Sequence, residues 1–521
     1  MKTRFLNKNT VIFFILTFFA FCFFSWNLSG QGYTLDEPAT IGVAKTVLHF
    51  GYPSPGDGKN DYGNLTWEYK EFQGRYFWTW HPWLPFYFIA PMYALFGNSI
   101  AMLRLPFVLF GALTVGAIYF ISNEFFKNKL VSILISLQLT FLLTFFLYVR
   151  QAHYYSPAAF FSLILLWLYW KSMQTSLNKK LVSLIFIVGF LLFQTNYLVW
   201  LSDMAILFIL TCWKRKPSYY ILLALSGIYG FLWFLVLQPY NGNTLSAYAG
   251  RTNLLLTIFH NISYLNNYVF PLIIGIFCFF AAYKLTQLRT YFLLIFVIGV
   301  KVFMYSLLVD PHGRFLVDIM PLCLLLYGFL YILLLRSRLS ILILFIFLLV
   351  TTSNIVSVFP AYLFNVNKQL LRFYPNEFAA EFSVKTEYEY VQIGQFLSAN
   401  EKKNDVFWIN TDNWSTELYT DTPMLDAICD IKTNRFTGPS LYKDPSKVRW
   451  YIFDTNVSTA LTTTPCLGEK WEKYLIKNYT KKVLSLNTKT YQLNDTDIVN
   501  RSFPPIPKYD KIVIYEKKNR L

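Results

Sequence analysis

The chain has 521 residues, of which 55% are apolar and 20% aromatic, and its mean hydropathy is +0.38. Stretches of about 18 or more apolar residues recur, and each is long enough to cross the hydrocarbon core of a bilayer. This composition excludes a soluble protein and predicts a polytopic α-helical membrane protein. The net charge of +17 does not indicate a nucleic-acid partner, because its distribution follows membrane topology instead.

The apolar stretches predict about eleven transmembrane helices, with the N-terminus in the cytoplasm. The run at 181–213 is too long for one span, and Asn196 and Asp203 mark its expected break on the outer side. The expected spans are 10–27, 99–121, 130–148, 156–170, two within 181–213, 219–238, 269–283, 291–309, 315–335 and 339–359.

Basic residues fix this orientation. The connections assigned to the cytoplasm carry 15 Lys and Arg residues, opposed only by Glu124, and cytoplasmic loops are generally enriched in these residues. The predicted location is therefore the plasma (inner) membrane, with the C-terminal part outside the cytoplasm. The basic residues in question are Lys2, Arg4, Lys8, Lys127, Lys129, Lys171, Lys179, Lys180, Lys214, Arg215, Lys216, Lys284, Arg289, Arg336 and Arg338.

An outer loop at 28–98 carries two adjacent carboxylates, Asp36 and Glu37, shortly after the first span. Acidic residues are scarce here, since residues 1–359 hold ten Asp and Glu against 24 Lys and Arg. The pair is therefore the first candidate for chemistry. The alternative is a helix start, because Pro38 favours the first helical position and an acidic residue before it can cap free N–H groups.

Further polar groups fall on the same outer side, namely Arg104, Arg150, Arg251, Arg314 and all five histidines. Lys301 lies near the middle of a span, and ionisable groups at that depth usually face a shared cavity. We expect an outward-facing cavity with carboxylates on one wall and cations on the other. The alternative for Arg314 is a local ion pair with Asp318, one helical turn away.

Residues 360–521 form the second expected domain, after a transmembrane domain at 1–359. This part holds 22 basic and 19 acidic residues and no run long enough to span. Short β-rich pieces such as 406–409 and 450–453 alternate with helical ones, which predicts an extracytoplasmic α/β domain. Its two cysteines, Cys429 and Cys466, form one disulfide or stay as free thiols.

The ordered motifs resemble the GT-C superfamily of membrane glycosyltransferases, nearest the branch of protein O-mannosyltransferases and lipid A aminoarabinose transferases. The resemblance covers roughly residues 10–335. One departure is His81-Pro82-Trp83, where relatives often carry a second proline. The motifs that carry the resemblance are Leu35-Asp36-Glu37, Ala44–Gly51, His81-Pro82-Trp83-Leu84, Phe96-Gly97, Arg104-Leu105-Pro106, Arg150 with Tyr154, and Arg314-Phe315-Leu316 with Pro321.

This resemblance implies transfer of a sugar from a polyprenyl-phosphate carrier to a lipid, glycan or protein acceptor on the outer face, with inversion. Asp36 would act as the catalytic base, and Glu37 would orient the acceptor or support Asp36. Arg314, Arg150 and Lys301 would bind the donor phosphate. Residues that would contact substrate are His81, Arg104, Tyr154 and His312.

Three other functions stay open: a transporter or flippase for a lipid-linked or anionic solute, an oligosaccharide ligase, and a catalytically silent assembly subunit. The sequence contains no inverted repeat, which argues against the transporter, and no WWD-type motif of oligosaccharyltransferases. No cofactor is required by the sequence. A divalent metal is left open, although no histidine spacing matches a zinc motif.

Overall fold

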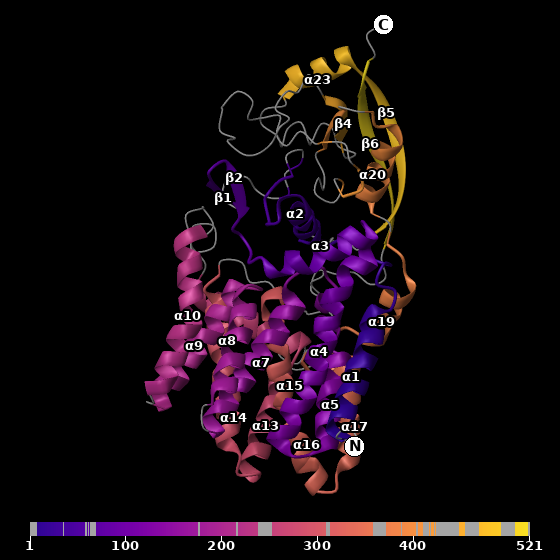
Figure 1. The fold of residues 1–521 in the computed structure, drawn as a ribbon. Coiled ribbons are helices and arrows are strands. Elements are labelled where there is room, and N and C mark those ends of the chain that lie inside the picture. The colour runs from indigo at the N-terminus through magenta and orange to yellow at the C-terminus, as the bar shows by residue number, and fades with distance from the viewer. Residues whose placement is uncertain are drawn as a thin grey trace, which may run out of the picture.

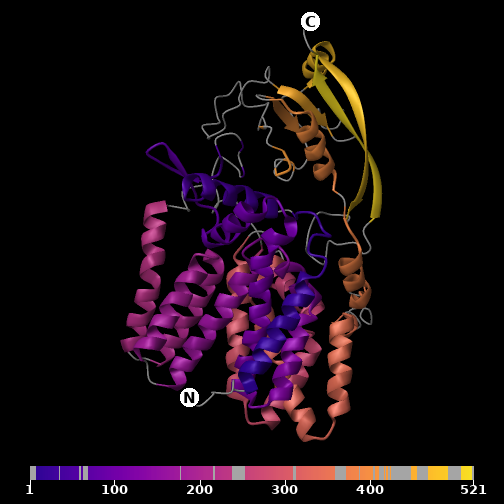
Figure 2. The same cartoon turned by 45° about the vertical axis from the view of Figure 1, so that its right-hand side comes forward.

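In the computed structural model, a helical bundle carries a layer of short elements on one face and a β-sheet beyond that layer (Figures 1 and 2). The structure describes residues 8–34, 36–57, 60, 62, 69–175, 178–214, 217–237, 253–308, 313–357, 371–386, 388–402, 405–409, 416, 418–420, 423, 448–453, 468–490 and 506–518.

Helices occupy each of the segments expected to span the membrane. Their outward faces carry exposed apolar side chains, such as Phe14, Ile15 and Phe18 of the first helix, as a helix facing lipid does. The bundle consists of α1 (Lys8–Ser25), α4 (Ile100–Phe126), α5 (Lys129–Thr140), α6 (Leu143–Val149), α7 (Tyr155–Gln174), α8 (Lys179–Phe193), α9 (Tyr197–Lys214), α10 (Pro217–Leu237), α12 (Leu254–Tyr268), α13 (Leu272–Lys284), α14 (Leu288–Ser306), η1 (Gly313–Leu316), α15 (Met320–Leu325), α16 (Tyr327–Arg336) and α17 (Ser340–Thr352).

The expected number of eleven spans is not established by helix length and apolarity. Among the described residues, four helices meet both requirements, or up to six if each of two bent pairs is one span. The bends measure 63° between α5 and α6 and 81° between α12 and α13. Two local expectations need correction. Residues 254–268, expected in an outer loop, form α12, and Asp203 lies inside α9 rather than at the break, which falls near Asn196.

The part of the chain between α1 and α4 forms a layer of short elements that covers one face of the bundle. It contains α2 (Glu37–Phe50), the hairpin β1 (Tyr69–Phe72) and β2 (Arg75–Trp78), and α3 (Leu84–Phe96). Gln73 and Gly74 turn the hairpin with φ of 51° and 74°, the positive values that a tight two-residue hairpin turn requires. The helix expected after Asp36 is confirmed, since α2 begins at Glu37.

The C-terminal part contains a four-stranded sheet in the order β3-β4-β6-β5, in which β3 and β4 are parallel and the other pairs antiparallel. Alternate side chains of β3 and β4 are buried on opposite faces, one of which packs against α20. The strands expected at 406–409 and 450–453 are confirmed. The elements are α19 (Tyr374–Ser383), α20 (Glu389–Asn400), β3 (Val406–Ile409), β4 (Val448–Phe453), α23 (Gly468–Asn478), β5 (Tyr479–Thr490) and β6 (Ile506–Lys517).

The chain just before α20 is tied to the segment that leads into α2. Thr386 donates its backbone N–H to the Gly30 carbonyl at 2.6 Å and accepts one from Gly32 at 3.0 Å. The Tyr390 hydroxyl donates to the Tyr33 carbonyl at 3.0 Å. These bonds hold the C-terminal part against the loop that carries Asp36. The expected domain boundary at 359/360, and Cys429 and Cys466, lie outside the described residues.

Candidate active site

Asp36 stands at the start of α2, but its side chain does not cap the helix. Its Oδ2 atom instead accepts a hydrogen bond from Tyr155 at 3.2 Å and a charged one from Nη1 of Arg314. Oδ1 accepts no hydrogen bond from the residues that the structure describes. A helix start alone does not explain a carboxylate turned towards an arginine 278 residues away. Asp36 therefore has partners in two other segments of the chain besides its place at the helix start.

Arg314 and Asp36 form a partly accessible pair, with side chains 22% and 32% exposed. The Nε atom of Arg314 is buried and has no hydrogen-bond partner in the described parts of the chain, although a buried donor normally has one. Burial disfavours the charged form of Asp36, but the Arg314 guanidinium and two nearby histidines outweigh this effect and lower its pKa. The pair offers an ionised carboxylate beside an unused N–H donor.

Glu37, the neighbour of Asp36, is fully buried against Arg104 of α4. The two side chains form a bidentate pair, with 2.8 Å between Nε and Oε1 and 2.6 Å between Nη2 and Oε2. Arg104 also donates to three backbone carbonyls in the loop before α2. All five of its N–H donors are therefore used. The carbonyls belong to Leu28, Gln31 and Gly32.

Backbone groups complete the shell around Glu37. The Ala152 N–H donates to its Oε1 at 2.7 Å, and the Thr34 N–H and hydroxyl donate to Oε2 at 2.9 Å. The Glu37–Arg104 pair thus joins the loop before α2, helix α4 and the turn before α7. Arg104 has no donor left for a substrate, which corrects its expected contact role. Glu37 is 0% exposed and so presents no surface to an acceptor, and its support of Asp36 stays a prediction.

Two histidines lie beside Asp36. His153 Nδ1 is 2.7 Å from the Thr40 hydroxyl, which gives its one proton to the Asp36 carbonyl at 2.8 Å. His153 is therefore the donor through Nδ1, and neutral imidazole keeps Nε2 as an acceptor. Burial lowers the pKa of His153 to about 4, and burial together with His153 holds the pKa of His81 well below its usual value. Both rings are neutral near pH 7.

Aromatic contacts set the position of His81. Its ring centre is 5.3 Å from that of His153 and 5.3 Å from that of Tyr154, which is itself buried. His81 and Tyr154 thus lie at the site as expected. The described residues include no group of three His, Cys, Asp or Glu side chains that could hold a metal ion.

The other expected donor-binding residues that the structure describes contact groups other than Asp36. Arg150 donates through Nη2 to the Asn27 carbonyl at 3.0 Å, and its guanidinium lies 4.6 Å from the centre of the Phe146 ring. Lys301 is fully buried between two aspartates in the bundle. His312 lies outside the described residues.

Three residues of this site have no role among those expected from the sequence, namely Tyr155, His153 and Thr40. Tyr155 and His153 flank the expected Tyr154 in the turn before α7, so the same motif carried a signal for them. Thr40 lies one helical turn after Asp36, where its hydroxyl reaches back to the Asp36 carbonyl. That position alone does not distinguish it from any other polar residue of α2.

Comparisons with known proteins agree with this description. Residues 80–236 match the family model described as dolichyl-phosphate-mannose-protein mannosyltransferase. No curated protein sequence matches the chain. Three solved structures share its fold across most of its length, at sequence identities of 10–12%.

Two of these structures are of ArnT from Cupriavidus metallidurans. The apo form matches with a TM-score of 0.56 at 12% identity, and the form bound to undecaprenyl phosphate with 0.57 at 11%; each match covers 97% of both chains. The third is the Archaeoglobus fulgidus oligosaccharyltransferase in complex with Zn and sulfate. Its TM-score is 0.52 at 10% identity, covering 96% of this chain and 72% of that one. The family match and these likenesses agree with the resemblance seen in the sequence, and the chain shares the fold of these membrane glycosyltransferases.

Proposed function

We propose that this enzyme moves a sugar from a polyprenyl-phosphate carrier to an acceptor hydroxyl or amine at the outer face of the plasma membrane. The single observation that carries the proposal is the contact between Asp36 and Arg314, which pairs a base with an anion-binding group. In this orientation the N-terminus is cytoplasmic and the sheet of β3–β6 lies outside. Acceptors of this class include lipids, glycans and proteins.

The two residues act on the two bonds that change: Asp36 on the acceptor that forms the new bond to the anomeric carbon, and Arg314 on the phosphate whose bond to that carbon breaks. The donor phosphate draws Arg314 to itself through Nη1 and the unused Nε, which frees the Asp36 carboxylate. Asp36 takes the acceptor proton as the acceptor attacks the anomeric carbon, and Arg314 stabilises the charge that develops on the departing phosphate. One such displacement inverts the anomeric centre.

An apolar pocket in the bundle is where we place the lipid tail of the carrier. It lies among α12, α13, α14 and α15, with Leu265, Phe279 and Phe303 among its lining residues. Its α12 wall reaches the segment of Arg314, because Gly313 packs so closely on Tyr264 that a Cβ atom there would overlap the tyrosine ring. A phosphate at Arg314 and a tail in this pocket are therefore compatible with one carrier molecule.

Transfer in proteoliposomes tests the proposal. Purified protein is given a panel of labelled polyprenyl-phosphate sugars together with an envelope extract as acceptor source. We expect label to enter the acceptor in step with release of sugar-free polyprenyl phosphate. Movement of intact donor across the bilayer without bond cleavage would contradict the proposal.

We expect Arg314→Gln to raise the donor KM and to lower kcat by about 10²-fold, the loss typical for one donor to a developing charge. The control is Arg449→Gln, which breaks similarly exposed pairs with Asp405 and Glu516 in the C-terminal sheet. It should leave both constants within about twofold. Wild-type kinetics for Arg314→Gln would remove this residue from the phosphate site.

The pH dependence should identify the base. Because Asp36 has a lowered pKa, it stays ionised at every pH well above 4, and the lowered pKa values of His81 and His153 keep both rings neutral near pH 7. We expect kcat/KM to show no acidic limb between about pH 5.5 and 8, since the ionised fraction of such a carboxylate is constant there. A fall centred near pH 6.5 would contradict this prediction, because neither Asp36 nor the two buried histidines should titrate there.

A further inference from the structure

A buried charged cluster lies in the bundle away from Asp36. The ammonium group of Lys301 bonds Asp318 Oδ2 at 2.6 Å and Ser162 Oγ at 3.0 Å, and it pairs with Asp203. The Tyr305 hydroxyl donates to the same Asp318 oxygen at 2.7 Å. Lys301 and Asp203 are 0% exposed. The cluster therefore joins α7, α9 and α14 to the segment between η1 and α15.

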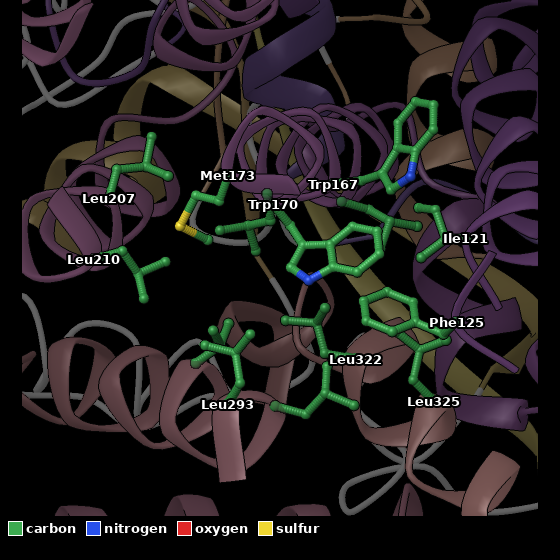
Figure 3. Close-up of a pocket in the computed structure, with 14 residues that line it drawn as sticks. Ile121, Phe125, Trp167, Trp170, Met173, Leu207, Leu210, Leu293, Leu322 and Leu325 are labelled. Carbon is green, nitrogen blue, oxygen red and sulfur yellow. The ribbon is translucent and has the colours of Figure 1, made fainter. Parts of the chain in front are cut away.

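This cluster lies between the candidate active site and a purely apolar region. On one side, a small pocket is lined by both Arg314 and Asp318, together with Tyr154 and Tyr155. On the other side, Leu322, one turn after Asp318, enters a pocket whose lining residues are apolar or tryptophan (Figure 3). In this setting an ionised group is costly without a partner, so the ion pairs hold their segments firmly.

The chain between the two charged groups is short. Arg314 belongs to η1, and Asp318 follows two residues after η1 ends. Asp318 is the member of the cluster on this segment, whereas Asp203 lies on α9. Lys301 thus pairs with two aspartates of equal charge. One of them, Asp318, lies four residues after Arg314, the proposed phosphate-binding residue.

We propose that Asp318, held by Lys301 and Tyr305, is a positioning residue that sets the place of Arg314 in the site. This inference rests on the proposed function of Arg314. Lys301 then acts on the donor through Asp318 and not as a direct ligand of the phosphate. The expected local pair between Arg314 and Asp318 is replaced by two separate pairs, Arg314 with Asp36 and Lys301 with Asp318.

The two aspartates provide a matched experiment. Asp318→Asn and Asp203→Asn remove the same charge from the same lysine at similar burial, but only the first lies on the segment of Arg314. We expect Asp318→Asn to raise the donor KM about tenfold, the size of one hydrogen bond to a charged group. Asp203→Asn should keep the donor KM within about twofold.

Thermal unfolding in detergent is measured for both variants, and Tyr305→Phe supplies a milder test if Asp318→Asn does not fold. Tyr305→Phe removes one bond to Asp318 and should raise the donor KM without loss of the folded protein. Equal donor KM changes in the two aspartate variants, or an unchanged KM in both Asp318→Asn and Tyr305→Phe, would overturn the inference. If Arg314→Gln still raises the donor KM in that case, the proposed function stands without it.

Discussion

Replacing Asp36 by Asn is expected to lower kcat for sugar transfer by about 10²- to 10⁴-fold, the contribution typical of a positioned general base. The amide has nearly the shape of the carboxylate and can still accept from Tyr155, so the fold around α2 should persist. What it lacks is a site for the proton that the acceptor loses during attack. The measurement is single-turnover transfer with donor bound in advance, which separates chemistry from donor binding.

The control for this variant is Asp57→Asn in the same loop. Asp57 accepts from the Tyr62 hydroxyl at 2.7 Å and lies outside the site, so this change should leave kcat within about twofold. If Asp36→Asn transfers as fast as the wild type while folding normally, Asp36 is only the first residue of a helix.

The second large effect is on stability and concerns the pair that fixes the catalytic loop. Arg104→Met should destabilise the protein by about 3–5 kcal/mol, because it leaves the Glu37 carboxylate buried without its charge partner. The double variant Arg104→Met with Glu37→Gln removes both charges and should be less destabilised than Arg104→Met alone. Thermal unfolding of the purified proteins in one detergent compares the variants.

Lys171→Met is the matched control for that measurement. Lys171 pairs with Glu124 at 3.7 Å, but both side chains are substantially exposed, and such pairs contribute about 0–1 kcal/mol. Its unfolding temperature should stay near that of the wild type. An Arg104→Met variant as stable as Lys171→Met would contradict the structural role of the Glu37 pair.

The sequence was sufficient for the helices and for the region of the site. Long apolar stretches can form only helices in a bilayer, since backbone groups must be satisfied within the segment. The helices of the bundle other than α12 could therefore be placed from composition. Asp36 stood out because acids are scarce in this half, and charge asymmetry assigned it to the same side as Arg314.

The different roles of Asp36 and Glu37 could not be predicted from composition and charge asymmetry. Successive residues in a helix point about 100° apart, so adjacent carboxylates at a helix start face different surroundings. Which of them is buried depends on Arg104, 67 positions away from Glu37. Contacts of this kind come from the packing of α4 against the loop, which no local pattern contains.

The sequence contains a further signal for the position of Lys301. Three ionisable residues, Lys301, Asp203 and Asp318, were visible within or beside apolar stretches, where charged groups must find partners. The sequence predicts a helix break at Asp203 and a contact of Lys301 with the donor phosphate, whereas the structure pairs the two side chains inside the bundle. Opposite charges at similar expected depth could have suggested that pair.

The most direct test of the central claim is binding of a sugar-free polyprenyl phosphate to the wild type, Asp36→Asn and Arg314→Gln in matched detergent. Asp36 is proposed to act on the acceptor and Arg314 on the phosphate. Asp36→Asn should therefore bind polyprenyl phosphate as tightly as the wild type or more tightly, because Arg314 loses its competing partner. Arg314→Gln should bind at least about tenfold more weakly, as expected when a charged hydrogen bond to phosphate is lost. Unchanged binding by Arg314→Gln, or loss of binding in Asp36→Asn, would contradict this account.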